Sequence, residues 1–113
     1  MLKKFMVLYM APVSAEAQMN VSPEEMKKGM EPWMAWFKKG GKVFVDAGTP
    51  LGNGMHFTKK AGTKSKTEVT GYSIVQAENM DAVKAMLADS PHFMMPKASI
   101  EVFEMMQMPV ELS

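Results

Sequence analysis

The sequence contains no cysteine, which excludes disulfides, thiolate nucleophiles and zinc sites built from cysteine. It also contains no arginine, because all 13 basic residues are lysine. Arginine supplies the planar, two-pronged donor that reads guanine and clamps phosphate or carboxylate groups. With a net charge of only +1, its absence predicts that the protein does not bind nucleic acid.

Histidine is scarce as well, since the chain has only His56 and His92. A metal site built from several histidines is therefore excluded within one chain, although a site that mixes histidine with carboxylates stays open. The sequence also lacks the motifs G-x-x-x-x-G-K-[ST], G-x-G-x-x-G and G-x-S-x-G, which mark nucleotide cradles and serine-hydrolase elbows. We assign no metal ligands and expect no cofactor.

No apolar run approaches the roughly 18 residues of a membrane span, so we expect no membrane partner. The basic start, the apolar residues 5–13 and Ala15-Glu16-Ala17 resemble a short secretory signal. The alternative is a β-strand over residues 3–10. We favour the strand because the apolar run is short and Glu16 lies inside the proposed cleavage site. Together with the lack of cysteine, this predicts a cytoplasmic protein.

Methionine, by contrast, is abundant, with 15 residues. Methionine-rich surfaces can bind copper or varied hydrophobic partners. In this chain the methionines are spread at spacings typical of core positions, so we expect most of them to fill the hydrophobic core.

Residues 22–41 carry a strong helix signal. Ser22 can cap the helix, and Pro23 fits its first turn, where a missing N–H group is harmless. Apolar side chains then recur at helical spacing, at Met26, Met30, Trp33, Met34 and Phe37. Two consecutive glycines end the pattern. Pro32 lies inside it, and because proline removes a backbone hydrogen bond, we expect a kink or two abutting helices.

The remaining segments alternate between strands and one more helix. Strand-like composition occurs at residues 3–10, 42–47, 68–77 and 98–107, with a shorter strand near 55–58. A second helix begins after Asn79. The order β-α-β-(β)-β-α-β predicts an α+β, ferredoxin-like antiparallel sheet in one domain over residues 1–113.

Such a sheet carries its helices on one face, and the sequence offers no third helix for the other face. Pairing of two chains through a two-fold axis would cover it. We therefore expect a homodimer.

Four stretches of the chain carry a family resemblance: residues 5–9, residues 22–26 with 33–36, residues 71–77 leading to 81–83, and Pro91-His92 followed by 99–102. In order and spacing they resemble the YCII-related (DGPF-type) family, over essentially the whole chain. The resemblance implies a dimeric α+β barrel.

The resemblance implies little about chemistry. Most members of the family have no established activity, while some relatives carry a His–Asp pair in a barrel pocket and are similar to small-molecule isomerases or dehalogenating lyases. In this chain Trp33 occupies the helix position where those relatives carry the histidine. The chain therefore lacks, at this position, the histidine that those relatives use in their mechanism.

His92 and Asp46 are the candidate catalytic residues. His92 follows a helix stop, where its ring could face a pocket, and a histidine beside a carboxylate can act as a general base. Asp46 ends an apolar strand, a common position for catalytic carboxylates. The structural alternatives are a loop histidine bonded to backbone and a turn-forming aspartate. Sequence separation does not decide whether the two residues meet.

Three aromatic residues, Trp33, Phe37 and Tyr72, are candidates to line an apolar ligand pocket. Core packing is the alternative for Trp33 and Phe37, and a solvent-facing hydroxyl is the alternative for Tyr72. His56 is expected on the surface.

Two functions follow from these observations. The first is a small-molecule-binding protein, with an isomerase-type or lyase-type proton transfer if it is an enzyme. The second is a non-catalytic dimerisation or accessory module. Whether the chain is an enzyme is left open by the sequence.

Overall fold

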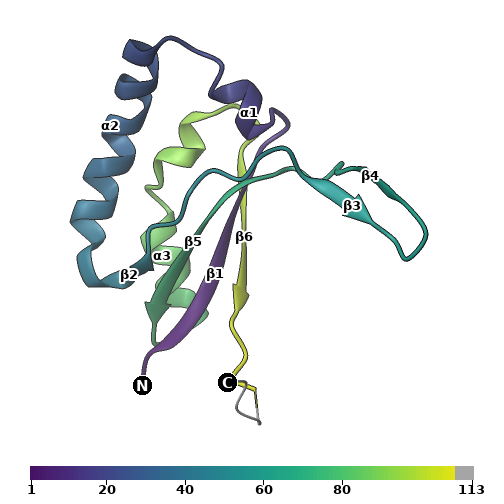
Figure 1. The fold of residues 1–113 in the computed structure, drawn as a ribbon. Coiled ribbons are helices and arrows are strands. Elements are labelled where there is room, and N and C mark those ends of the chain that lie inside the picture. Colours follow the sequence, from purple (N-terminus) through teal and green to yellow (C-terminus); the bar gives the residue numbers. More distant parts are fainter. Residues whose placement is uncertain (109–113) are drawn as a thin grey trace.

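The computed structural model describes residues 1–108. The elements run in the order β1 (Lys3–Met10), α1 (Ala15–Gln18), α2 (Pro23–Gly40), the 3-10 turn η1 (Gly41–Val43), β2 (Phe44–Asp46), β3 (Met55–Phe57), β4 (Gly62–Lys64), β5 (Val69–Ala77), α3 (Met80–Leu87), the 3-10 turn η2 (Pro91–Met94) and β6 (Ser99–Glu104). Figure 1 shows their arrangement.

The main sheet has four strands in the order β2-β5-β1-β6, and every neighbouring pair is antiparallel. Each outer strand follows a helix that leaves a central strand, so two strand–helix–strand units interleave. This arrangement confirms the predicted α+β class with an antiparallel sheet, and it is compatible with a ferredoxin-like fold. The predicted strand over 42–47 is shorter, because its first residues form η1.

Helix α2 begins as the sequence predicts, with the Ser22 hydroxyl accepting a hydrogen bond from the backbone N–H of Glu25 at 3.2 Å. The helix continues past Pro32 to Gly40 as one element, so the alternative of two abutting helices is wrong. It ends where Gly41 takes a positive φ of 52°, a conformation that glycine adopts without strain.

Both long helices pack against one face of the sheet, and alternation along β1 explains why. Phe5, Val7 and Tyr9 are buried and belong to the same core cluster as Trp36 of α2. The cluster also contains Val75 from β5 with Val83 and Leu87 from α3. Since successive strand residues point to opposite faces, every second residue of β1 contributes to this core.

The buried core cluster contains none of the described methionines, although half-buried Met86 packs against it, so the prediction that most methionines fill the core is wrong. Most of the 15 are exposed: Met1, Met19, Met30, Met34, Met55, Met80, Met94, Met105, Met106 and Met108. Branched and aromatic residues of β1 and β5 occupy the interior instead. The methionines therefore contribute apolar surface.

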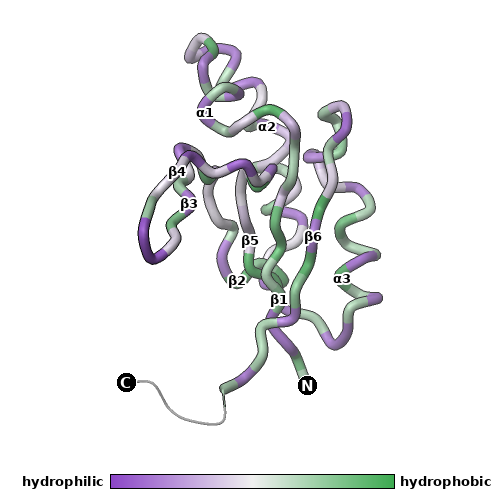
Figure 2. Tube along the Cα trace, turned by 90° about the vertical axis from the view of Figure 1, so that its right-hand side faces the viewer, coloured by the Kyte–Doolittle hydropathy of each residue, from purple (hydrophilic) through white to green (hydrophobic). Residues whose placement is uncertain are grey.

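Within residues 1–108, no helix lies over the opposite face of the sheet (Figure 1). Its central positions are half-buried apolar side chains, including Met6, Leu8 and Ile74. Phe103 from the edge strand β6 is 55% exposed and pairs with Met6. Figure 2 shows hydrophobic colouring along β1 and β6. We call these residues the open sheet face.

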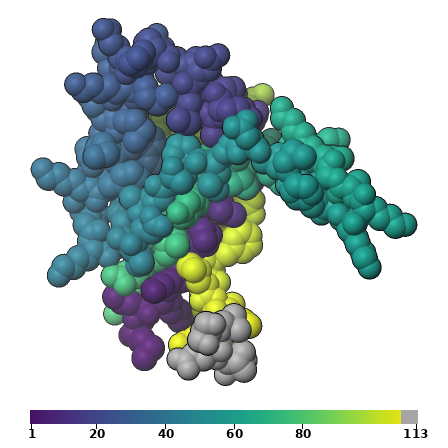
Figure 3. Space-filling view, viewed as in Figure 1, coloured from purple at the N-terminus to yellow at the C-terminus, as the bar shows by residue number. Residues whose placement is uncertain are grey.

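Strands β3 and β4 form a separate two-stranded hairpin, which projects from the body (Figures 1 and 3). The sequence predicted β3 but not this second sheet. Phe57 on the hairpin is 74% exposed, and His56 is exposed as expected.

Candidate aromatic cavity

A cavity of about 550 Å³ lies between α1, α2 and the segment 47–50. Its lining is mostly apolar and includes Tyr9, Ala15, Gln18, Met19, Val21, Glu25, Met26, Gly29, Met30, Trp33, Phe37, Ala47, Gly48, Thr49, Pro50, Thr70, Gly71, Tyr72 and His92. This volume lies within the range of small-molecule sites. We call it the aromatic cavity.

Trp33 is the centre of the aromatic rings in this cavity. Its ring centroid lies 5.0 Å from that of Tyr9 in an edge-to-face arrangement, and 5.8 Å from that of Phe37. His92 lies 6.2 Å from Trp33 and 5.3 Å from Tyr9, also between ring centroids. Trp33 and Phe37 line the cavity and also pack against the core cluster.

His92 is 4% exposed and lines the cavity. Its backbone N–H donates to the Ser90 hydroxyl at 3.3 Å, at the start of η2. Its ring Nε2 lies 2.8 Å from the backbone oxygen of Met10. Because a carbonyl oxygen only accepts, Nε2 carries the hydrogen. In the neutral ring Nδ1 is then the acceptor.

Asp46 does not meet His92. One carboxylate oxygen accepts a hydrogen bond from the backbone N–H of Gly48 at 2.8 Å, and the other accepts from the Tyr72 hydroxyl at 3.0 Å. Asp46 pairs with Ile74, a residue of the open sheet face, and it is not part of the cavity lining. The structure therefore gives Asp46 the turn-forming role and does not bring the predicted pair together.

Tyr72 borders the cavity, but its hydroxyl is engaged by Asp46. That hydrogen bond, and then the negative charge of Asp46, raise the pKa of the Tyr72 phenol. The cavity wall at Gly48 lies close to β5. A Cβ atom added at this position, where φ is +82°, would lie 1.7 Å from the Tyr72 backbone oxygen. Only glycine is compatible with this approach.

Tyr9 is a cavity residue that the sequence analysis did not single out. Its hydroxyl lies 2.8 Å from that of Ser73, and the Ser73 hydroxyl donates to the Ala47 backbone oxygen at 2.6 Å. Since Ser73 has one hydrogen to donate, Tyr9 is the donor in the first bond. No signal in the sequence marks this role, because residues 5–10 are apolar at every position and only the structure shows that Tyr9 shares the inner face with Phe5 and Val7.

Burial raises the pKa of Tyr9 to about 12 from an ordinary value of 10.0. The raised pKa of Tyr9 therefore contributes on the order of 2–3 kcal/mol to the free energy of unfolding, and this contribution is fully present below pH 10. It is lost as the pH rises from 10 toward 12. We expect the free energy of unfolding to fall steeply between these values.

The measurement is urea unfolding at a series of alkaline pH values. Tyr9→Phe should flatten the decrease strongly. Tyr72→Phe, at the less buried tyrosine, whose pKa is also raised, should retain more of it. Equal slopes in the two variants would show that Tyr9 ionisation does not control alkaline stability.

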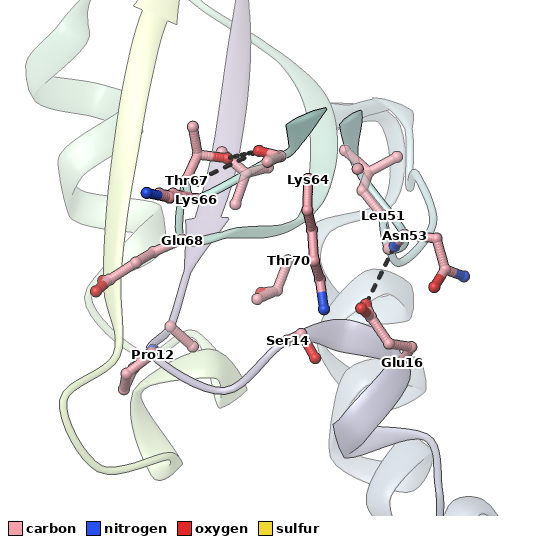
Figure 4. Close-up of a pocket in the computed structure, with 15 residues that line it drawn as sticks. Pro12, Ser14, Glu16, Leu51, Asn53, Lys64, Lys66, Thr67, Glu68 and Thr70 are labelled. Carbon is pink, nitrogen blue, oxygen red and sulfur yellow. Dashed lines mark hydrogen bonds between the residues drawn. The ribbon is translucent and has the colours of Figure 1, made fainter. Parts of the chain in front are cut away.

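A second cavity of about 450 Å³ lies at the base of the hairpin. Figure 4 shows Lys64 reaching toward Glu16, and Lys66 and Glu68 also line this space. The backbone N–H groups of Glu16 itself and of Asn53 hold the pKa of the Glu16 carboxyl below its ordinary value. This hairpin cavity carries charges of both signs.

Residues 1–108 contain no group of three or more histidine and carboxylate side chains placed to hold a metal ion. Within the same part of the chain, no helix is long and apolar enough to cross a membrane.

Comparison with known protein families found no family that matches this chain, and comparison with curated proteins found no relative.

Proposed function

We propose that the protein binds a small, largely apolar molecule in the aromatic cavity. The observation that carries this proposal is the cavity itself, about 550 Å³ in volume and lined by Tyr9, Trp33, Phe37 and His92. Three aromatic rings offer a large contact area, and a few polar groups among them can orient a ligand.

His92 gives the cavity a route to proton transfer. Imidazole can take up and release a proton near neutral pH, and the bond from Nε2 to Met10 holds the ring in one orientation and one tautomer. The chemistry we propose is a single-base proton transfer of the isomerase or lyase type, with Nδ1 of His92 as the acceptor. Asp46 takes no part in it, because its carboxylate binds Tyr72 and Gly48.

We further propose that two chains form a homodimer through the open sheet face, as in the dimeric barrels of the YCII-related family. The apolar side chains of Met6, Leu8, Ile74 and Phe103 support this assembly. The order of strands and helices along the chain is compatible with the subunit of such a dimeric barrel.

A non-catalytic binding or accessory module is the second candidate. It is favoured by the fact that both predicted catalytic residues have structural partners, His92 on Met10 and Asp46 on Tyr72 and Gly48. The aromatic cavity would then bind a ligand without converting it. The two candidates differ in whether a bound ligand exchanges a proton with solvent faster than it does when free.

The two tryptophans provide the test of ligand binding. Trp33 lines the cavity, whereas Trp36 is 7% exposed and does not line it. In a nuclear magnetic resonance screen of small aromatic and aliphatic compounds, we expect binding compounds to shift the indole N–H signal of Trp33 much more than that of Trp36. If no compound moves the Trp33 signal at millimolar concentration, the proposed function is wrong.

A further inference from the structure

The two cavities differ sharply in charge. Among the described residues, those that line the aromatic cavity include one charged side chain, Glu25, and no lysine. The hairpin cavity, in contrast, is lined by Lys64 and Lys66 with two glutamates. Lysine accounts for all 13 Lys and Arg residues of the chain, so its absence from the aromatic cavity leaves no permanently charged cation there to receive an anionic ligand.

The aromatic rings favour the opposite charge. The faces of Tyr9, Trp33 and Phe37 carry negative electrostatic potential, which attracts cations and repels anions. The methionines at the rim add sulfur atoms that are weak acceptors. Met19 and Met30 are both exposed there, so the rim also offers apolar surface to the body of a ligand.

Two polar side chains of the cavity, Glu25 and His92, can accept hydrogen bonds. The Glu25 backbone N–H is bonded to the Ser22 hydroxyl at 3.2 Å, which holds this residue in the first turn of α2 beside the cavity. In the neutral ring of His92, Nε2 donates to Met10 and Nδ1 is left as an acceptor. The Glu25 carboxylate and the His92 imidazole are therefore both acceptors that an ammonium group can use.

The dipole of α2 acts against a preference for cations, because its positive end lies at the start of the helix and attracts anions. Glu24 and Glu25 both lie in this first turn and counter it with full negative charges. Ser22 also occupies the Glu25 N–H group. The two glutamates therefore offset the positive end of the dipole at this side of the cavity.

We infer that the ligand of the aromatic cavity is an organic cation, an ammonium-type group on an apolar body. The inference rests on the proposed function, and it adds the charge of the ligand. Glu25 supplies the counter-charge. The aromatic rings contact the apolar body of the ligand and the carbon atoms next to the ammonium group, which share its positive charge. Anionic analogues are rejected.

Three probes of similar size test the charge preference: 2-phenylethylamine, 2-phenylethanol and 3-phenylpropionate. At neutral pH they are cationic, neutral and anionic. From the usual strength of cation–π contacts, we expect the amine to bind roughly three- to thirtyfold more tightly than the alcohol. The carboxylate should bind most weakly. The readout is the shift of the Trp33 indole signal during titration.

Two matched variants test the role of Glu25. Glu25→Gln and Glu24→Gln remove the same charge from the same helix turn, but only Glu25 lines the cavity. Glu25→Gln should weaken amine binding about three- to fivefold, the effect of losing one partly exposed charge pair, and leave alcohol binding unchanged. Glu24→Gln should leave both unchanged.

The outcomes separate this inference from the proposed function. If the alcohol or the carboxylate binds as tightly as the amine, the inference is overturned while the binding function stands. If Glu25→Gln leaves amine binding unchanged, or Glu24→Gln weakens it equally, the inference is also overturned. If none of the three probes shifts the Trp33 signal while other compounds do, the ligand is not a cation of this kind. If no compound shifts it, the proposed function fails as well.

Discussion

Met6→Glu is expected to convert the proposed homodimer into folded monomers. Met6 lies at the centre of the open sheet face, where it pairs with Ile74 on one side and Phe103 on the other. A carboxylate buried there without a partner would cost several kcal/mol per chain. The dissociation constant should therefore rise by at least about 100-fold.

The fold itself should tolerate this change, because Met6 is only half-buried in one chain and the new carboxylate can reach water. Sedimentation at micromolar concentration measures the oligomeric state, and circular dichroism reports the fold. Met34→Glu is the matched control, since Met34 is 62% exposed on α2 and should leave the dimer intact.

Two results would contradict the dimer. One is a wild-type protein that sediments as a monomer at these concentrations. The other is a Met6→Glu variant that is folded and still dimeric, which would place the interface on another surface, such as the projecting hairpin.

Local patterns in the sequence predict much of this fold, because they act over a few residues. The apolar run within residues 3–10 predicts the strand β1, and Ser22 caps α2 through the bond that the capping pattern predicts. The methionines show the limit of such patterns. Helical spacing is the same for a core stripe and for a cavity rim, so the position of Met30 could not be assigned without the surrounding elements.

Asp46 shows why the site was harder to predict than the fold. In a regular strand, residues two apart point to the same face, so Asp46 should share the inner face with Phe44. The register shifts between them, however: Phe44 pairs with Val75 and Asp46 with Ile74. This irregularity turns Asp46 to the open sheet face, away from His92, and a one-residue shift of this kind leaves no mark in the sequence.

His92 combines two predictions that the sequence treated as alternatives. The ring is bonded to backbone, as expected of a structural histidine, and it also borders the cavity. Its partner Met10 lies 82 residues away in the chain, a contact that only the assembled fold creates. Tyr9 was overlooked for a related reason, because its role depends on Ser73 and Ala47 from two distant segments.

Gly29→Phe is expected to abolish ligand binding while the protein stays folded. Gly29 lies within α2 and lines the aromatic cavity, and a Cβ atom added there would meet nothing within 4 Å. The phenylalanine ring has room to enter the cavity and occupy the volume that a ligand needs. Glycine is also the weakest helix former after proline, so the substitution should not lower the stability of α2.

Gly29→Ala provides the matched control, because it removes the same glycine but adds only a methyl group. We expect it to raise the free energy of unfolding by about 0.5–1 kcal/mol and to leave ligand affinity within about twofold of wild type, since a methyl group fills little of the cavity. Thermal melts and Trp33 titrations measure the two properties separately.

If Gly29→Phe is folded and binds ligand like the wild type, the ligand lies outside the aromatic cavity. If Gly29→Ala abolishes binding too, the bound molecule must contact the backbone of α2 directly, and the site is narrower than the cavity suggests.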